Sequence, residues 1–222
     1  MGTTIELTTS DGHKLGAYQA EPSGAPRGSV LVIQEIFGVN AHIRSVCDDY
    51  AQEGYRALAP ALFDRVERGV ELGYDGPATQ RGAGIVMQLK PGDVLRDLQA
   101  SADELAKTGK VGVVGYCYGG TMTWAAACRL DRIAAASSYY GGRIAQQLDK
   151  PPRVPVILHF GEQDAMIPVA DIDKVRAAFP DVPVFVYPAG HGFNCDARAS
   201  YHAESAKLAK QRTLELLAKH LG

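Results

Sequence analysis

Short apolar runs recur along the chain at intervals that suit buried strands. They are SVLVI (29–33), YRALA (55–59), VGVVG (111–115), IAAASSYY (133–140), VPVILHF (154–160) and VPVFVY (182–187). Most do not alternate between apolar and polar residues, which is typical of strands buried on both faces of a parallel sheet. Residues 3–9 and 13–20 do alternate, around an Asp-Gly turn, and this pattern predicts an antiparallel hairpin at the sheet edge.

Helical periodicity fills the intervals between these strands. Apolar residues recur at helical spacing over 43–50 and 94–105, a further helix is expected after Pro168, and a long terminal helix is expected over 199–221. Strand and helix therefore alternate along most of the chain. This order predicts an α/β fold with a mostly parallel central sheet, an antiparallel N-terminal hairpin and helices on both faces.

The 222 residues suit a single domain of this kind, so one domain over 1–222 is expected. One stretch, 64–92, is polar, rich in glycine and far longer than an ordinary connection. Long loops of this kind tend to be lids or binding loops, so the stretch is a candidate active-site loop. The alternative is a surface excursion with a short helix over 79–89.

Charge and composition exclude several classes of partner. The chain has 23 Lys and Arg against 25 Asp and Glu, a net charge of −2 that argues against nucleic-acid binding. No leader-like segment and no 18-residue apolar run is present, so no membrane association is expected. Four scattered cysteines without a C-x-x-C pair favour reduced thiols and a cytoplasmic protein. The protein is expected to be a monomer or a weak homodimer.

One strand runs directly into a turn that is typical of a catalytic nucleophile. The strand VGVV leads into GYCYGG (115–120) and then into a helical pattern, which is the G-x-S-x-G elbow with Cys117 in place of serine. The glycines let strand and helix approach closely, and the helix N-terminus stabilises a thiolate. The alternative is a buried cysteine that happens to lie beside glycines.

A thiol nucleophile needs a base, and the base needs a carboxylate that orients it. Downstream of Cys117, His191 lies in the loop GHGF (190–193) after one strand. Asp164 ends the loop GEQD (161–164) after another strand, with Glu162 as the alternative carboxylate. This order of nucleophile, acid and histidine is the order found in hydrolases with such an elbow.

The remaining histidines and cysteines have ordinary explanations. His159 lies within a predicted strand and is expected in the core with its hydrogen bonds satisfied. The histidines expected at exposed ends or on solvated helix faces are His13, His42, His202 and His220. The cysteines expected to fill the core are Cys47 and Cys128. The role of Cys195 is left open. Cys195 and His191 could be two ligands of a metal ion, but no third ligand lies at a suitable spacing, so no metal is expected. No cofactor is expected either.

The motifs together resemble those of a known family, the dienelactone hydrolases or carboxymethylenebutenolidases, which are small enzymes of the α/β-hydrolase fold with a cysteine nucleophile. The matching motifs are QEIFG (34–38), ELGY (71–74), GYCYGG (115–120), YYG (139–141), GEQD (161–164) and GHGF (190–193). The resemblance implies a triad of Cys117, Asp164 and His191. It also implies that Glu35 lies beside the thiol and helps to switch it between thiol and thiolate. The alternative for Glu35 is an ion pair with Arg44 or a hydrogen bond with a nearby amide.

The loop that carries Glu35 has a second expected use. In hydrolases with this elbow, one oxyanion-hole N–H comes from the loop after the corresponding strand and the other from the residue after the nucleophile. These donors are expected to be the backbone N–H groups of Ile36 and Tyr118.

Substrate binding is where the sequence departs from the family, whose substrates are lactones with a free carboxylate held by arginines. Arg81 matches one such arginine, but Ile85 stands where a tyrosine is expected. Cys195 replaces the second arginine, with Arg198 as the nearest basic residue. The further candidate substrate-binding residues are Phe37 and Tyr139.

The sequence therefore predicts a hydrolase that opens a small lactone or ester through Cys117, with dienelactone-like substrates and an anionic substrate as a candidate. A broad carboxylesterase is the alternative within the same class. A catalytically idle ligand-binding or thiol-sensing protein of the same fold is the alternative from another class.

Overall fold

The protein is built on one eight-stranded sheet in the order β1-β2-β4-β3-β5-β6-β7-β8. The computed structural model describes residues 2–222. The strands are β1 (Thr3–Thr8), β2 (Lys14–Ala20), β3 (Ser29–Ile33), β4 (Arg56–Pro60), β5 (Val111–Tyr116), β6 (Ile133–Tyr139), β7 (Val156–Gly161) and β8 (Val184–Tyr187). The β1–β2 and β2–β4 pairs are antiparallel and all other pairs are parallel. The expected mostly parallel sheet with an antiparallel N-terminal hairpin is confirmed.

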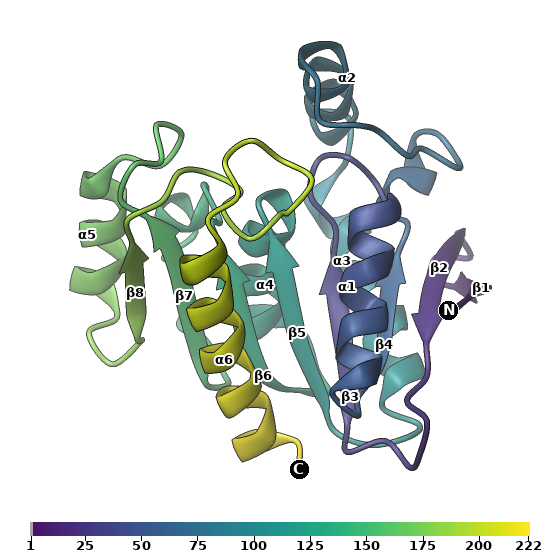
Figure 1. The fold of residues 1–222 in the computed structure, drawn as a ribbon. Coiled ribbons are helices and arrows are strands. Elements are labelled where there is room, and N and C mark those ends of the chain that lie inside the picture. Colours follow the sequence, from purple (N-terminus) through teal and green to yellow (C-terminus); the bar gives the residue numbers. More distant parts are fainter. Residues whose placement is uncertain (1) are drawn as a thin grey trace.

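The described residues form six α-helices, most of which pack on the sheet. They are α1 (Ala41–Gln52), α2 (Gly76–Val86), α3 (Pro91–Leu105), α4 (Tyr118–Arg129), α5 (Val169–Ala178) and α6 (Ala203–His220). In Figure 1, α1 and α6 cross the near face of the sheet while α3 and α4 lie behind it, so helices cover both faces as expected. Only α2 stands apart, above the end of the sheet at which the parallel strands finish.

Burial on both faces explains why the central strands lack polar alternation. Every residue of β3 and of β5 is buried. The covering helix α4 is itself apolar around most of its circumference and buries Trp124 completely. These layers fix the carboxyl ends of β3 and β5, where the loops with candidate catalytic residues begin.

Two boundaries differ from the sequence-based expectation, and local capping explains both. The stretch 64–92 contains the full helix α2, whose first turn is capped by Asp75 through a 2.7 Å hydrogen bond from the Ala78 N–H. The terminal helix begins at Ala203 rather than near 199, because His202 accepts a hydrogen bond from the Ser205 N–H and caps it. Residues before His202 are thus left in a loop, which reaches toward the end of β3.

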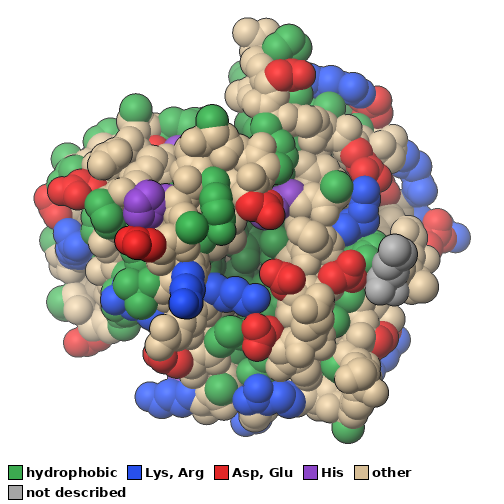
Figure 2. Space-filling view, in the orientation of Figure 1, with side chains coloured by type: hydrophobic (Ala, Val, Ile, Leu, Met, Phe, Trp, Pro, Cys, Tyr) green, Lys and Arg blue, Asp and Glu red, His purple; other side chains and the backbone are tan. Residues whose placement is uncertain are grey.

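The surface carries both signs of charge. On the face drawn in Figure 2, acidic and basic side chains are interspersed, in keeping with the near balance of the two in the sequence. Among the helices of residues 2–222, none combines the length and the apolar character that a bilayer-spanning segment needs.

Candidate active site

Cys117 lies at the sharp turn between β5 and α4. Its φ of 56° is in the left-handed region, where a residue with a side chain is strained. The neighbouring glycines make the turn possible: a Cβ on Gly115 would lie 2.2 Å from the Gly119 carbonyl oxygen, and one on Gly119 would lie 2.2 Å from the Ile33 carbonyl oxygen. The glycine spacing read from the sequence therefore has the steric cause expected for a nucleophile elbow.

His191 and Asp164 form a hydrogen-bonded chain with this cysteine. The Nε2 atom of His191 lies 3.1 Å from the Cys117 sulfur, and its Nδ1 atom lies 2.7 Å from Asp164 Oδ2. The second oxygen of Asp164 accepts a 2.8 Å hydrogen bond from the Met166 N–H, which holds the carboxylate in place. Glu162 is exposed, and the carboxylate that bonds to His191 is that of Asp164, so the geometry favours Asp164 over the alternative.

The surroundings of His191 favour its protonated form. Burial acts to lower the pKa of the imidazole, but the hydrogen bonds with Asp164 and Cys117 outweigh burial and raise the pKa to about 10. An imidazolium held between a carboxylate and a cysteine sulfur can stabilise a thiolate and can later donate its proton to a leaving group.

A tyrosine pair follows β6, and the structure separates the two side chains. Tyr139, expected to bind substrate, is buried in the core with its hydroxyl 2.7 Å from the Thr213 hydroxyl, so it packs the sheet and does not face the cleft. Tyr140 has a φ of 40° and places its ring edge-on to the His191 ring at 5.1 Å. Tyr140 was not among the predicted site residues; its position directly after a strand, beside a glycine, was the available signal.

Glu35 is buried and forms an ion pair with Arg198. The Nη1 atom of Arg198 donates to Glu35 Oε1 over 3.2 Å. The alternative partner Arg44 instead pairs with Glu71 at 2.6 Å, so that alternative is wrong. The guanidinium of Arg198 also lies over the Phe37 ring, 5.7 Å from its centroid. The structure thus brings three of the predicted residues, Glu35, Phe37 and Arg198, into one cluster.

The two loops expected to provide oxyanion donors are packed against each other. Tyr118 is the first residue of α4, where a backbone N–H has no acceptor within the helix. A Cβ on Gly119 would also lie 2.6 Å from the Gln34 carbonyl oxygen, so the start of α4 touches the loop that carries Ile36. Gln34 is buried and fixes that loop by accepting a 3.1 Å hydrogen bond from the Leu62 N–H.

The segment 64–92 packs against the same loop. A Cβ on Gly82 of α2 would lie only 1.9 Å from the Ile36 carbonyl oxygen, and the Leu72 N–H donates to the Phe37 carbonyl over 2.9 Å. Arg81, the predicted substrate arginine of this segment, is about half exposed and pairs with Glu67 at 2.7 Å. The segment therefore contacts the loop that carries Ile36 through Gly82, whereas the Arg81 side chain makes its ion pair at the surface.

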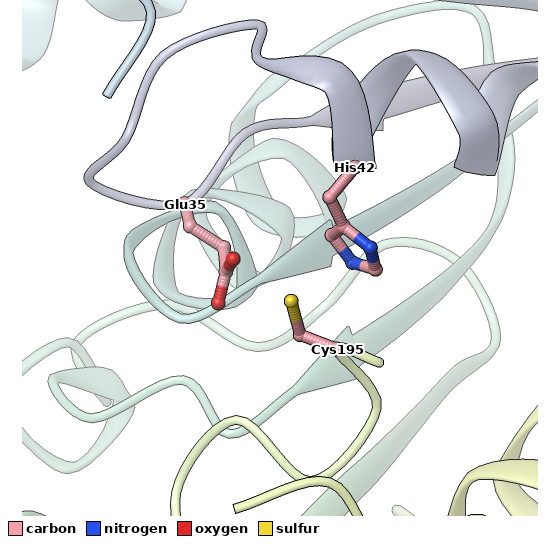
Figure 3. Close-up of side chains that lie close together, drawn as sticks. All are labelled: Glu35, His42 and Cys195. Carbon is pink, nitrogen blue, oxygen red and sulfur yellow. The ribbon is translucent and has the colours of Figure 1, made fainter. Parts of the chain in front are cut away.

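Two residues outside the expected set lie beside Glu35. His42 was expected near an exposed end but is buried, because the first turn of α1 faces the loop after His191. Its ring points toward Cys195 and toward the Glu35 carboxylate (Figure 3).

His159 lies in the core as expected: it is fully buried, with hydrogen bonds to the Tyr187 and Ser137 hydroxyls.

Comparison with known proteins identifies the family of the chain. The family model described as "Dienelactone hydrolase family" matches residues 15–221, which is nearly the whole chain. The chain belongs to the dienelactone hydrolase family. It is 37% identical to a candidate carboxymethylenebutenolidase of Synechocystis sp. across 99% of this chain and 97% of the relative. It is 33% identical to the carboxymethylenebutenolidase of Pseudomonas putida, across 96% and 95% respectively.

Solved structures agree with this family assignment. The structure of a candidate dienelactone hydrolase from Klebsiella pneumoniae is 34% identical, with a TM-score of 0.85, and the match covers 99% of this chain and all of the other. The dienelactone hydrolase of Anabaena variabilis, at 18% identity and a TM-score of 0.73, shares the fold across all of this chain and 99% of the other. The chain is therefore a dienelactone hydrolase-like hydrolase with the α/β-hydrolase fold.

Proposed function

We propose that the protein hydrolyses a small lactone or ester with Cys117 as the nucleophile, His191 as general acid and base, and Asp164 as the residue that orients the histidine. The observation that carries the proposal is the chain of contacts from sulfur to imidazole to carboxylate, at 3.1 and 2.7 Å. Nucleophile, base and orienting carboxylate within hydrogen-bond reach form the arrangement that covalent acyl transfer requires.

The first half of the reaction forms a thioester. The Cys117 thiolate attacks the carbonyl carbon, and the N–H groups of Ile36 and Tyr118 stabilise the negative charge that develops on the carbonyl oxygen. When the tetrahedral intermediate collapses, the carbon–oxygen bond of the ester breaks and the imidazolium of His191 gives its proton to the leaving oxygen. In a lactone, that oxygen stays attached to the acyl group.

The second half restores the enzyme. His191, now neutral, accepts a proton from a water molecule as the water attacks the thioester carbonyl. The carbon–sulfur bond breaks, the free acid leaves, and Cys117 and His191 return to their starting protonation states. Asp164 keeps the Nδ1–H of His191 directed toward itself through both halves, so Nε2 always faces the reacting atoms.

Arg198 is the better candidate for binding a substrate carboxylate. Its side chain is mostly buried and its ionic partner is Glu35, whereas Arg81 is paired with Glu67 at the surface. A substrate carboxylate at Arg198 would compete with Glu35 for the same guanidinium. Release of Glu35 from Arg198 offers a physical route to the switching role that the family resemblance implies for this glutamate.

Two alternative functions make predictions that differ from those of the proposed lactone or ester hydrolase. A broad carboxylesterase would not prefer a carboxylated lactone over its neutral methyl ester. A thiol-sensing protein would keep the contact between Cys117 and His191 but would not turn over esters. A cytoplasmic location and a monomer or weak homodimer remain predictions from the sequence.

The test is a panel of lactones and esters, with and without a free carboxylate, assayed at neutral pH. Cys117→Ala should be folded and inactive on every substrate that the unmodified protein hydrolyses. Cys128→Ala is the matched control, since Cys128 is a buried free cysteine at the opposite end of α4 from Cys117. Full activity of Cys117→Ala would refute the cysteine mechanism, and a folded protein inactive on the whole panel would favour the sensing alternative.

A further inference from the structure

Three metal-ligating side chains from separate parts of the chain converge beside the ion pair of Glu35 and Arg198. Glu35 comes from the loop after β3, His42 from the first turn of α1 and Cys195 from the loop after His191 (Figure 3). A carboxylate oxygen, a ring nitrogen and the sulfur all lie within 4.8 Å of one another. The Glu35 side chain is 1% exposed, that of His42 is 6% exposed, and Cys195 is fully buried.

Two atoms of this cluster are buried without a hydrogen-bond partner. Among the described residues, none donates to Glu35 Oε2 and none bonds to His42 Nε2. Buried polar atoms are nearly always satisfied, because an unpaired one costs the free energy of its lost hydration. Two such atoms in one cluster, with a cysteine sulfur beside them, indicate a missing partner that accepts electron pairs from all three.

The other ring nitrogen of His42 is already engaged. Its Nδ1 atom lies 3.3 Å from Asp196 Oδ1, which leaves Nε2 as the atom available to a ligand. Histidines that bind metals usually donate the second ring N–H to a carboxylate, which fixes the tautomer and the ring orientation. Asp196 therefore supplies the outer carboxylate that a metal-binding histidine normally has.

We propose that Glu35, His42 and Cys195 form a zinc site, with His42 oriented by Asp196 and a water molecule in the fourth position. A thiolate, an imidazole and a carboxylate together are ligands typical of zinc, and three protein ligands plus water is the usual composition of an open zinc site. Bond lengths of about 2.0 to 2.3 Å place tetrahedral ligands roughly 3.3 to 3.6 Å apart. Side-chain shifts of about 1 Å would close the cluster around the ion.

The charges around the cluster suit this ion. Glu35 accepts from Arg198 through Oε1 and keeps Oε2 free, so the carboxylate can bridge the guanidinium and the metal. Cys195 is completely buried, which disfavours a thiolate unless a cation lies beside the sulfur, and zinc would be that cation. Zinc binding would replace the S–H bond of Cys195 by a zinc–sulfur bond and release the thiol proton to solvent.

The site was not visible in the sequence because its ligands are far apart in the chain. His191 and Cys195 share a helical spacing, but His191 is engaged with Asp164 and Cys117. The partners of Cys195 instead come from two positions near the start of the chain, and only the fold brings them together.

The experiment is a titration of the Cys117→Ala variant with Co²⁺, followed by calorimetric titration of the same variant with Zn²⁺. Removal of Cys117 excludes metal binding at the catalytic thiol, so the readout is independent of the proposed hydrolase mechanism. We expect one equivalent of Co²⁺ to produce a thiolate-to-cobalt charge-transfer band in the near ultraviolet. Adding Cys195→Ser should remove the band and weaken Zn²⁺ binding by more than about 100-fold, since even an outer partner is typically worth 10- to 100-fold.

Two further variants complete the test in the same background. His42→Gln should weaken Zn²⁺ binding to a similar degree, and Cys128→Ser should leave both the band and the affinity unchanged. Circular dichroism checks that each variant is folded; Cys195→Ser, which changes one atom, decides the outcome if His42→Gln does not fold. Absence of the band in Cys117→Ala, or a band that survives Cys195→Ser, would overturn the proposal.

Discussion

A single methyl group on α2 should disturb the oxyanion loop, because Gly82 touches the carbonyl of Ile36. A Cβ at position 82 would lie 1.9 Å from that oxygen and 3.0 Å from its carbon. Restoring an ordinary contact requires the helix or the Ile36 peptide to move by about 1.5 Å. The substitution Gly82→Ala therefore displaces the proposed oxyanion donor without altering any catalytic side chain.

The expected magnitude follows from two opposing effects on stability and one on catalysis. Overpacking destabilises by about 1 to 3 kcal/mol, whereas alanine in place of glycine stabilises a helix by up to about 1 kcal/mol. A misplacement of about 1 Å can cost a factor of roughly 100, and complete loss of one oxyanion donor costs about 100- to 1,000-fold in kcat. We expect Gly82→Ala to lower kcat by about 10- to 100-fold and the free energy of unfolding by at most about 2 kcal/mol.

Gly84, two residues further along the same helix, is the matched control. No atom lies within 4 Å of a Cβ built on Gly84. Gly84→Ala should therefore raise the free energy of unfolding by about 0.5 to 1 kcal/mol and leave kcat unchanged. Steady-state hydrolysis of 4-nitrophenyl acetate gives kcat, and urea denaturation gives stability. If Gly82→Ala keeps kcat within about twofold of the unmodified protein while Gly84→Ala behaves as expected, α2 does not hold the oxyanion loop and the reasoning is wrong.

The remaining predictions concern the acid, the base and the arginines. Asp164→Asn should lower kcat by about 10³- to 10⁴-fold because the wrong imidazole tautomer becomes favoured, whereas Glu162→Gln should be mild; the reverse pattern would mean that the acid is misassigned. In NMR titrations the His191 ring should stay protonated through neutral pH and lose its proton as the pH rises through about 10, and Asp164→Asn should move the midpoint toward 6.5. A midpoint already near 6.5 in the unmodified protein would contradict the raised pKa. Arg198→Ala should lower kcat/KM for a carboxylated lactone, relative to its methyl ester, by roughly 10- to 150-fold, as expected for loss of one charge-assisted contact, and Arg81→Ala should change the ratio by less than about fivefold. An unchanged ratio in both variants would favour a general esterase.

The sequence predicted the sheet and the nucleophile turn well because both depend on local patterns. Unalternated apolar runs located β3 and β5 to within a residue, since strands covered on both faces have no polar side. The elbow was equally visible because its strand, its Gly-x-Cys-x-Gly turn and its helix follow one another directly in the sequence. The order of Asp164 and His191 along the chain then followed from the loops at the ends of β7 and β8.

Contacts between distant segments were not predictable in the same way. The sequence could not show that Arg198 reaches Glu35, because the partner depends on where the loop before α6 lies. It could not show that His42 is buried beside Cys195, because the sequence of a helix's first turn does not reveal that a distant loop packs over it. For Tyr139 and Tyr140, the φ of 40° at Tyr140 decides which ring faces His191, and the position of Tyr140 between a strand and a glycine was the only hint of this in the sequence.

The most direct test of the central claim is to identify the residue that becomes acylated during turnover. The protein is mixed with excess 4-nitrophenyl acetate, quenched with acid within the first turnovers, digested and analysed by mass spectrometry. We expect one acetyl group per chain, located on Cys117 within its peptide, and none in the Cys117→Ala variant. An acetyl group on a different residue, or rapid hydrolysis by folded Cys117→Ala, would contradict it.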